Sequence, residues 1–213
     1  LRQIDELRNI FAFPKSATPK LDDLPKYARE GRGQLPLAVC RPPHVVVSAA
    51  RNFAVYTEEF LVVPPRQIGI VSPTGDKALL KALALYLSSD FAFYHQFLTS
   101  SQFGVKRDVA TLKALRQIPV PVAEAESIEL EPWVELHRKL AATKPRALHP
   151  EEKEQQELFE KDEEKQDALL AQLNKLVSDA LDLDDRERAL VHDLVHVRLA
   201  LNDGKLGKEA VRQ

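Results

Sequence analysis

The sequence has 213 residues, of which 44% are hydrophobic, so it is long and apolar enough to build a buried core. No apolar run reaches the roughly 20 residues that cross a bilayer, and Asp5 and Glu6 stand where a secretory signal would be basic and then apolar. The single Cys40 fits a reducing compartment, so we expect a cytoplasmic protein. The formal net charge of −2 hides two opposite signs, because residues 1–121 carry 16 Lys and Arg against 10 Asp and Glu, whereas residues 122–213 carry 14 against 22.

We therefore expect a polyanionic partner to bind the first part of the chain. This part begins with a connecting segment, residues 1–34. Apolar residues recur at helical spacing from Leu1 to Phe11, and a loop-like run follows. The sequence contains no methionine, even at position 1, so we expect it to begin inside a longer reading frame. The helix would then lead from an upstream domain.

Five short stretches rich in β-branched and aromatic residues predict a small, mostly antiparallel sheet. They are residues 37–40, 44–47, 53–56, 60–63 and 68–71. Proline pairs at 42–43 and 64–65 separate some of them, as is typical of strands joined by turns. We expect Cys40 to be a small core residue within this sheet.

A long amphipathic helix, capped by Asp76, is predicted at about residues 77–99. Its leucine and aromatic residues recur at helical spacing, so its apolar stripe should form the core with the sheet. A short helix at 108–115 follows, and residues 118–121, where two prolines exclude a helix, mark the end of the domain. Sheet and helix together predict an α+β domain at residues 35–121.

Residues 122–213 predict an acidic helical extension. We expect a helix around 133–142, a long helix opened by Pro150 that runs to Leu181, and a last helix capped by Asp184 and Glu187. The last two helices should lie antiparallel. Leucines such as Leu173 are expected to pack mainly within the extension, which would make it a separable support.

Three motifs follow one another between Leu79 and Pro121. A leucine-rich helix ends in the small polar pair Ser88-Ser89, and a serine-containing loop is followed by Gly-Val before a basic residue at 104–106. A helix then closes on Ile-Pro-Val-Pro at 118–121. In this order the motifs resemble the target-recognition domains of bacterial DNA adenine methyltransferases, the specificity parts of restriction-modification or phage-exclusion systems. With its flanking strands and helical tail, the resemblance covers roughly residues 41–204, and it implies that residues 35–121 are a DNA target-recognition domain, which reads a specific DNA sequence.

Polar side chains on the loops around the predicted core are the candidate DNA contacts. They are Arg51, Asn52, Arg66, Gln67, Gln102, Lys106 and Arg107. Arg can pair bidentately with guanine and Asn or Gln with adenine, whereas Lys mainly neutralises phosphates. An ordinary solvated role is the alternative for each of them, and we favour DNA contact most for Lys106 and Arg107, which follow the loop of the matching motif.

The motifs that would transfer the methyl group are absent from the sequence. DNA adenine methyltransferases hold the flipped adenine with an Asp/Asn/Ser-Pro-Pro-Tyr/Phe motif and S-adenosylmethionine with a Gly-rich turn. The proline pairs at 42–43 and 64–65 lack the polar and aromatic neighbours of that motif. We therefore expect no catalytic residue, cofactor or metal in this chain. The resemblance implies S-adenosylmethionine for the intact protein, with a catalytic domain upstream or in another subunit and double-stranded DNA as the partner.

Two other functions stay open at this point. His192 and His196 stand at i and i+4, which is metal-ligand spacing, so a small metal-dependent enzyme is one alternative to a plain polar helix face. The other is a helical protein-interaction module, because the acidity and leucine spacing of residues 122–213 suit protein contacts.

Overall fold

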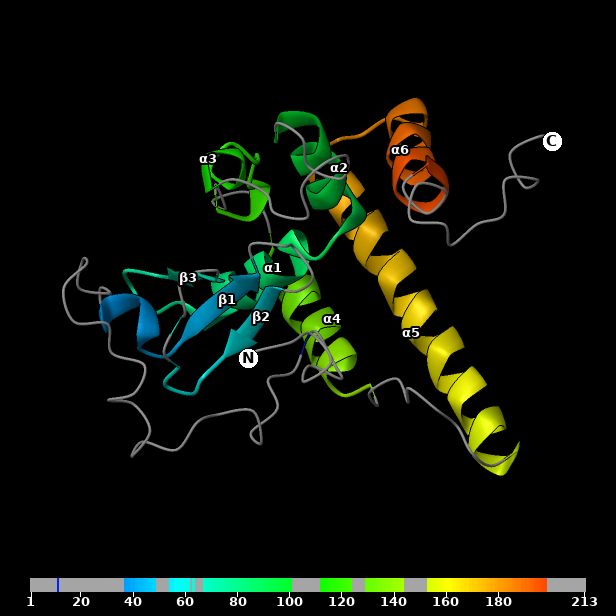
Figure 1. The fold of residues 1–213 in the computed structure, drawn as a ribbon, viewed down its shortest axis with the longest axis horizontal. Coiled ribbons are helices and arrows are strands. Elements are labelled where there is room, and N and C mark those ends of the chain that lie inside the picture. The colour runs from blue at the N-terminus through cyan, green and yellow to red at the C-terminus, as the bar shows by residue number, and fades with distance from the viewer. Residues whose placement is uncertain are drawn as a thin grey trace.

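The computed structural model describes residues 11, 37–48, 54–61, 63, 67–100, 112–123, 129–143 and 153–198. These residues form a small antiparallel sheet with several helices (Figure 1), so the α+β class predicted from the sequence is confirmed. None of the described helices is both long enough and apolar enough to cross a membrane. Of the predicted connecting segment 1–34, only Phe11 is described, and it is buried in the main core; the helix predicted there lies outside the described residues.

The described sheet has the strand order β2-β1-β3, and both neighbouring pairs are antiparallel. β1 (His44–Ser48) lies between β2 (Ala54–Thr57) and β3 (Gln67–Val71). Val45 belongs to the main core cluster beneath the helices, while its neighbour Val46 belongs to a smaller cluster on the other face. A run of consecutive valines suits β1 because both of its faces are buried.

Two of the five predicted strands are not strands. Residues Leu37–Cys40 form a 3-10 helix, η4, and the described residues of the predicted strand at 60–63 are not part of the sheet. The backbone N–H of Leu61 donates to the carbonyl of Cys40 at 3.2 Å, and both residues, with Val63, fill the smaller cluster. A short apolar run can be buried in this way without joining a strand ladder, and its pattern alone does not distinguish the two cases. Cys40 is buried, as predicted.

The single helix predicted at 77–99 is in fact two helices, α1 (Lys77–Leu87) and α2 (Asp90–Thr99). Asp76 caps α1 as predicted. The break has a local cause, because the hydroxyl of Ser89 accepts from the backbone N–H of Ala92 at 3.3 Å and so caps a new helix. Serine side chains compete with helical backbone in this way even where the leucine pattern continues.

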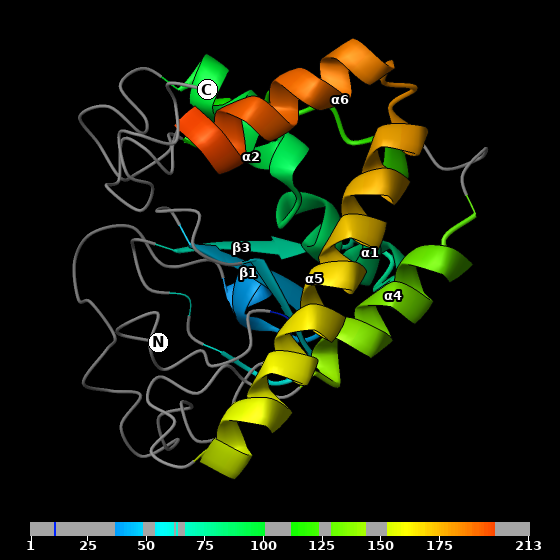
Figure 2. The same cartoon turned by 90° about the vertical axis from the view of Figure 1, so that its right-hand side faces the viewer.

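α1 covers one face of the sheet, α4 (Glu131–Ala141) packs on α1, and α5 (Lys153–Ala180) packs on α4 and α1 (Figure 2). Their buried side chains belong to one cluster, to which α4 contributes Trp133 and α5 contributes Leu173 and Val177. Leu173, which we expected to pack mainly within the helical extension, is thus in one cluster with buried residues of the sheet, α1 and α4. The residue completes the core that the sheet and α1 begin.

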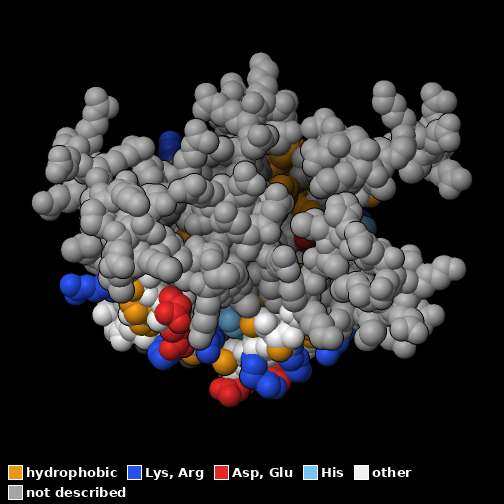
Figure 3. All heavy atoms as spheres, turned by 60° about the horizontal axis from the view of Figure 1, so that its bottom comes forward, with side chains coloured by type: hydrophobic (Ala, Val, Ile, Leu, Met, Phe, Trp, Pro, Cys, Tyr) orange, Lys and Arg blue, Asp and Glu red, His pale blue; other side chains and the backbone are white. Residues whose placement is uncertain are grey.

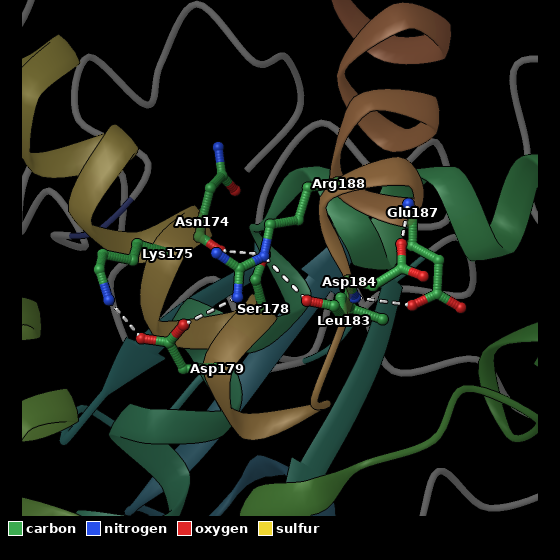
Figure 4. Close-up of polar contacts among 8 residues, drawn as sticks. All are labelled: Asn174, Lys175, Ser178, Asp179, Leu183, Asp184, Glu187 and Arg188. Atoms are coloured by element: carbon green, nitrogen blue, oxygen red, sulfur yellow. Dashed lines mark hydrogen bonds and ion pairs between the residues drawn. The ribbon is translucent and has the colours of Figure 1, made fainter.

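A tight corner ends α5 (Figure 4). Asp182 has a φ of 52°, in the left-handed region. Its backbone N–H donates to the carbonyl of Asp179 at 3.3 Å, and the N–H of Leu183 donates to the carbonyl of Ser178 at 3.0 Å. This pair of hydrogen bonds is the Schellman motif, which satisfies the last carbonyls of a helix while the chain changes direction.

The chain then forms α6 (Asp185–His192), whose predicted capping box of Asp184 and Glu187 is confirmed. A π-helical turn, η6 (Asp193–Arg198), continues α6, and both contact α2. Of the short helix predicted at 108–115, the described part is α3 (Leu112–Leu115), which also contacts α2. α2 is thus the point where helices from both halves of the sequence meet.

Candidate nucleic-acid interface

Of the seven side chains predicted to contact DNA, the structure describes one, Gln67. The other six, Arg51, Asn52, Arg66, Gln102, Lys106 and Arg107, lie outside the described residues. Gln67 is half-buried at the start of β3 and lies opposite Ser48, the last residue of β1. For the other six residues, the structure shows only the parts of the fold to which their segments connect.

One end of each of the three strands lies at the same end of the sheet, which we call the Ser48 end. Ser48 ends β1, Ala54 begins β2 and Gln67 begins β3, and the register brings them together because Val47 pairs with Ala54 and Ser48 with Gln67. In the sequence, residues 49–53 connect Ser48 to Ala54 and include Arg51 and Asn52, and Arg66 directly precedes Gln67. Three predicted contact residues are therefore tethered to this end by short stretches of chain.

The junction between α1 and α2 lies next to the Ser48 end. Ser88 stands between the two helices, and its hydroxyl lies 3.5 Å from the carbonyl oxygen of Ala54. From this junction α2 runs to Thr99, three residues before Gln102, and α3 begins at Leu112. Figure 1 shows α2 and α3 above the sheet. In the sequence, Arg51, Asn52, Arg66 and Gln67 thus lie at or next to the strand ends of the Ser48 end, and Gln102, Lys106 and Arg107 lie between α2 and α3.

Two distant parts of the chain hold the first residue of α2. The backbone N–H of Asp90 donates to Oδ1 of Asn174 on α5 at 3.1 Å, and Nδ2 of Asn174 donates back to Oδ2 of Asp90 at 2.7 Å. Nε2 of His196 on η6 donates to the same carboxylate oxygen at 2.6 Å. Sequence reasoning missed Asp90 and Asn174, because no local spacing connects residues that are 84 positions apart.

His196, one of the two histidines at metal-ligand spacing, is hydrogen-bonded to Asp90. The rings of His192 and His196 have their centroids 4.8 Å apart, and the ring of His196 is the one that bonds Asp90. Among the described residues, no group of three or more His, Cys, Asp or Glu side chains is arranged to hold a metal ion. The arrangement in this part of the chain is one of hydrogen bonding between helices.

A second polar cluster surrounds Tyr56, towards the opposite end of β2. The Tyr56 hydroxyl donates to Oε1 of Glu58 at 2.7 Å, and Nζ of Lys77 lies 2.6 Å from Oε2 of Glu58. Nζ of Lys81 lies 5.3 Å from the centroid of the Tyr56 ring, and the ring of His137 packs edge-on against it at 5.7 Å between centroids. The cluster joins β2, α1 and α4.

The surroundings shift the pKa values of Tyr56, Glu58 and His137. Burial, with the adjacent Glu58, raises the pKa of Tyr56. Hydrogen bonds from Lys77 and Tyr56 lower the pKa of Glu58, and burial with the positive charge of Lys81 lowers the pKa of His137 to about 4. The phenol stays protonated, Glu58 ionised and His137 neutral, so the cluster suits structural bonding rather than proton transfer.

The described cations are interspersed with acids. Of the Lys and Arg in residues 1–121, the described ones are Arg41, Lys77, Lys81, Lys113 and Arg116, against Glu58, Glu59, Asp76 and Asp90. On the face drawn in Figure 3, the described Lys and Arg side chains lie among Asp and Glu side chains. The positive excess of residues 1–121 therefore belongs mostly to segments outside the described residues, which include Lys106 and Arg107.

Comparisons with models of protein families, with curated proteins and with solved structures found no match to this chain. Function is therefore inferred from the residues themselves and from where the described elements lie.

Proposed function

We propose that this chain is the DNA sequence-recognition domain of an S-adenosylmethionine-dependent DNA adenine methyltransferase from a bacterial restriction-modification or phage-defence system. It acts in the cytoplasm on double-stranded DNA. Methyl transfer is assigned to a catalytic domain outside this sequence, upstream or in another subunit, because the adenine-holding and cofactor-holding motifs are absent here.

One observation carries the proposal: the segments with the predicted contact residues connect to neighbouring parts of the described fold. Arg51, Asn52 and Arg66 are tethered to the Ser48 end, while Gln102 follows Thr99, the last residue of α2, by three residues. Rigid scaffolds that present loops from one side are a common way to read DNA, because phosphate contacts and base contacts must act in a fixed register. The excess of Lys and Arg in residues 1–121 favours a polyanionic partner in the same region.

Binding to duplex DNA across a salt titration tests the proposal. The chain alone should bind weakly, with a Kd on the order of 1–100 µM at low salt, since phosphate contacts dominate in the absence of its catalytic partner. Lys106→Ala/Arg107→Ala should lower the steepness of log affinity against log salt by about 0.9 for each phosphate that is no longer neutralised.

A charge-matched variant provides the control. Arg138→Ala/Lys139→Ala removes two positive charges from α4, where both side chains pair with Glu135, and it should leave the salt dependence unchanged. If the Lys106/Arg107 variant binds duplex DNA as well as the parent at every salt concentration, the proposed contact surface is wrong.

A further inference from the structure

β3 is an edge strand of the described sheet. It pairs with β1 on one side, over five consecutive residue pairs without a bulge. Every second residue of such a strand directs its backbone N–H and C=O groups away from the strand that it pairs with. Among the described residues, no hydrogen bond from outside the sheet reaches the backbone of residues 68–71. The outer side of β3 thus offers a row of donors and acceptors to another strand.

The two edges of the described sheet differ in how they are covered. All four residues of β2 are buried, and α1 packs against that strand. All five residues of β3 are only half-buried, and Figure 1 shows β3 on the side of the sheet away from α4 and α5. η4 also contacts β3, but it lies over the face of the strand at Gly69. β3 is therefore the edge that another strand can reach.

The sequence of β3, Gln-Ile-Gly-Ile-Val, contains none of the residues that protect an exposed edge. Natural proteins place lysine or other charges, proline or a bulge on such strands, and these prevent pairing with another chain. β3 has no charged residue and no proline. Ile68 and Ile70 pack against the main core but stay half-exposed, so a strand added at this edge would cover apolar surface as well as backbone groups.

The strand is nearly symmetric about Gly69, so it fits a second copy of itself. In an antiparallel pair with a two-fold axis at Gly69, Ile68 lies opposite the partner's Ile70, and Gln67 lies opposite the partner's Val71. Cross-strand pairs of β-branched residues stabilise a sheet, and no like charges meet in this register. It is also the one antiparallel register that pairs all five residues of both strands.

We propose that β3 is a self-association edge, at which two copies of this chain pair their β3 strands antiparallel about Gly69 and join their three-stranded sheets into one. A single pair of short strands buries little surface, so the dimer is weak and depends on concentration. The inference concerns a protein partner and does not depend on the binding of DNA.

Sedimentation velocity of the full chain, at concentrations from about 10 to 500 µM, tests for a weak dimer. The weight-average sedimentation coefficient should rise with concentration from the value of a monomer towards that of a dimer. Over the same range, amide hydrogen exchange should become slower in β3, because its outward N–H groups acquire partners, and should stay unchanged in α6.

Two substitutions of Ile70 form a matched pair at the proposed interface. Ile70→Lys places a charge on the edge, as natural sheets do to prevent pairing, and it should weaken the dimer at least about tenfold, because the two-fold axis repeats the change in both halves of the interface. Ile70→Val keeps an apolar, β-branched side chain and should stay within about threefold of the parent. Circular dichroism at low concentration checks that both variants are folded.

A parent chain that remains monomeric at every concentration overturns the proposal. A dimer whose β3 amides exchange as fast as those of the monomer also overturns it, because association would then use another surface. The same holds if folded Ile70→Lys associates as strongly as the parent. If Ile70→Lys does not fold, hydrogen exchange of the parent alone decides.

Discussion

At the scale of single residues, His137 shows how burial fixes the charge of one side chain. Its ring lies against Tyr56, and its Nε2 atom is buried without a hydrogen-bond partner. Burial and the nearby charge of Lys81 lower its pKa from 6.5 to about 4. The unfolded chain regains the ordinary pKa, so it accepts a proton that the folded protein refuses.

We predict an acid sensitivity that His137 controls. Because the folded pKa is the lower one, the stabilisation from neutral His137 is fully present above about pH 6.5 and is lost as the pH falls towards 4. Between pH 7 and pH 5, this group should reduce the free energy of unfolding by about 2 kcal/mol. Urea unfolding at the two pH values, followed by the fluorescence of Trp133, the single tryptophan, measures the loss.

His137→Leu is the matched variant, because it removes the titrating ring and keeps an apolar side chain of similar size. It should lose about 2 kcal/mol less than the parent over the same pH range. The other buried histidines are present in both proteins and cancel in the comparison. Equal acid sensitivity of parent and variant would mean that His137 ionises freely in the folded state.

Contacts between residues that are distant in the sequence are the part of the fold that residue patterns could not predict. His137 looks isolated in the sequence because Tyr56 and Lys81 are distant from it along the chain. Gly69 is similar: a Cβ there would lie 2.8 Å from the carbonyl oxygen of Val39 and 3.0 Å from its Cβ. A glycine within a strand indicates that something approaches closely, but only the structure shows that the neighbour is η4.

At the scale of elements, the corner between α5 and α6 places an aspartate where the backbone favours glycine. Asp182 is exposed and has a φ of 52°. A side chain in this left-handed region costs roughly 1 kcal/mol, although Asp tolerates it better than most residues. The hydrogen bonds of Leu183 and Arg188 around the corner offset that cost.

Asp182→Gly is therefore expected to stabilise the protein by about 0.5–1 kcal/mol, since relief of the backbone strain outweighs the greater freedom of glycine in the unfolded chain. Thermal unfolding measures the change. Asp182→Asn separates the two possible causes, because it removes the same negative charge and keeps a side chain at this position. If the Asn and Gly variants are equally stable, charge rather than backbone conformation governs the corner.

Signals at element ends were predicted well, because they depend on a few neighbouring residues. The Asp76 cap and the Asp184–Glu187 capping box are both present as expected. The break between α1 and α2 was missed, since the leucine pattern runs across Ser88 and Ser89. The contact of η4 with Leu61 was missed for the opposite reason: a short apolar segment is buried equally well as a strand or as a 3-10 turn.

At the scale of the whole molecule, the sequence predicts layers of sheet and helix but not which helices share a core. Spacing shows that Leu173 faces inwards from its helix, and it gives no information about the neighbour that the residue meets. The net charges of residues 1–121 and 122–213 have opposite signs, but charge describes the surface and does not show which residues share a core. The structure places Leu173 and Val177, each 1% exposed, in one cluster with Tyr86 and Leu136.

We predict, against the expectation from sequence, that a fragment of residues 1–150 does not unfold cooperatively. The fragment lacks two fully buried side chains, Leu173 and Val177, and the burial of each contributes about 1.5–3 kcal/mol to the free energy of unfolding. It also removes partly buried leucines of α5 and the partners of Asp90. Together these lost contributions are comparable with the roughly 5–15 kcal/mol by which a domain is stable. Without α5, α1 and α4 would also be left with an exposed apolar face.

Urea unfolding of the fragment and of the full chain, followed by circular dichroism and by Trp133 fluorescence, measures this dependence on α5. Two point variants in the full chain show that the effect comes from the core. Leu173→Ala should cost about 2–5 kcal/mol with the cooperative transition retained, whereas Gln172→Ala, at the exposed neighbouring position, should change stability by less than about 0.5 kcal/mol. A fragment that unfolds cooperatively at the midpoint of the full chain would mean that the sheet, α1 and α4 form a complete core without α5, and that the extension only rests against it.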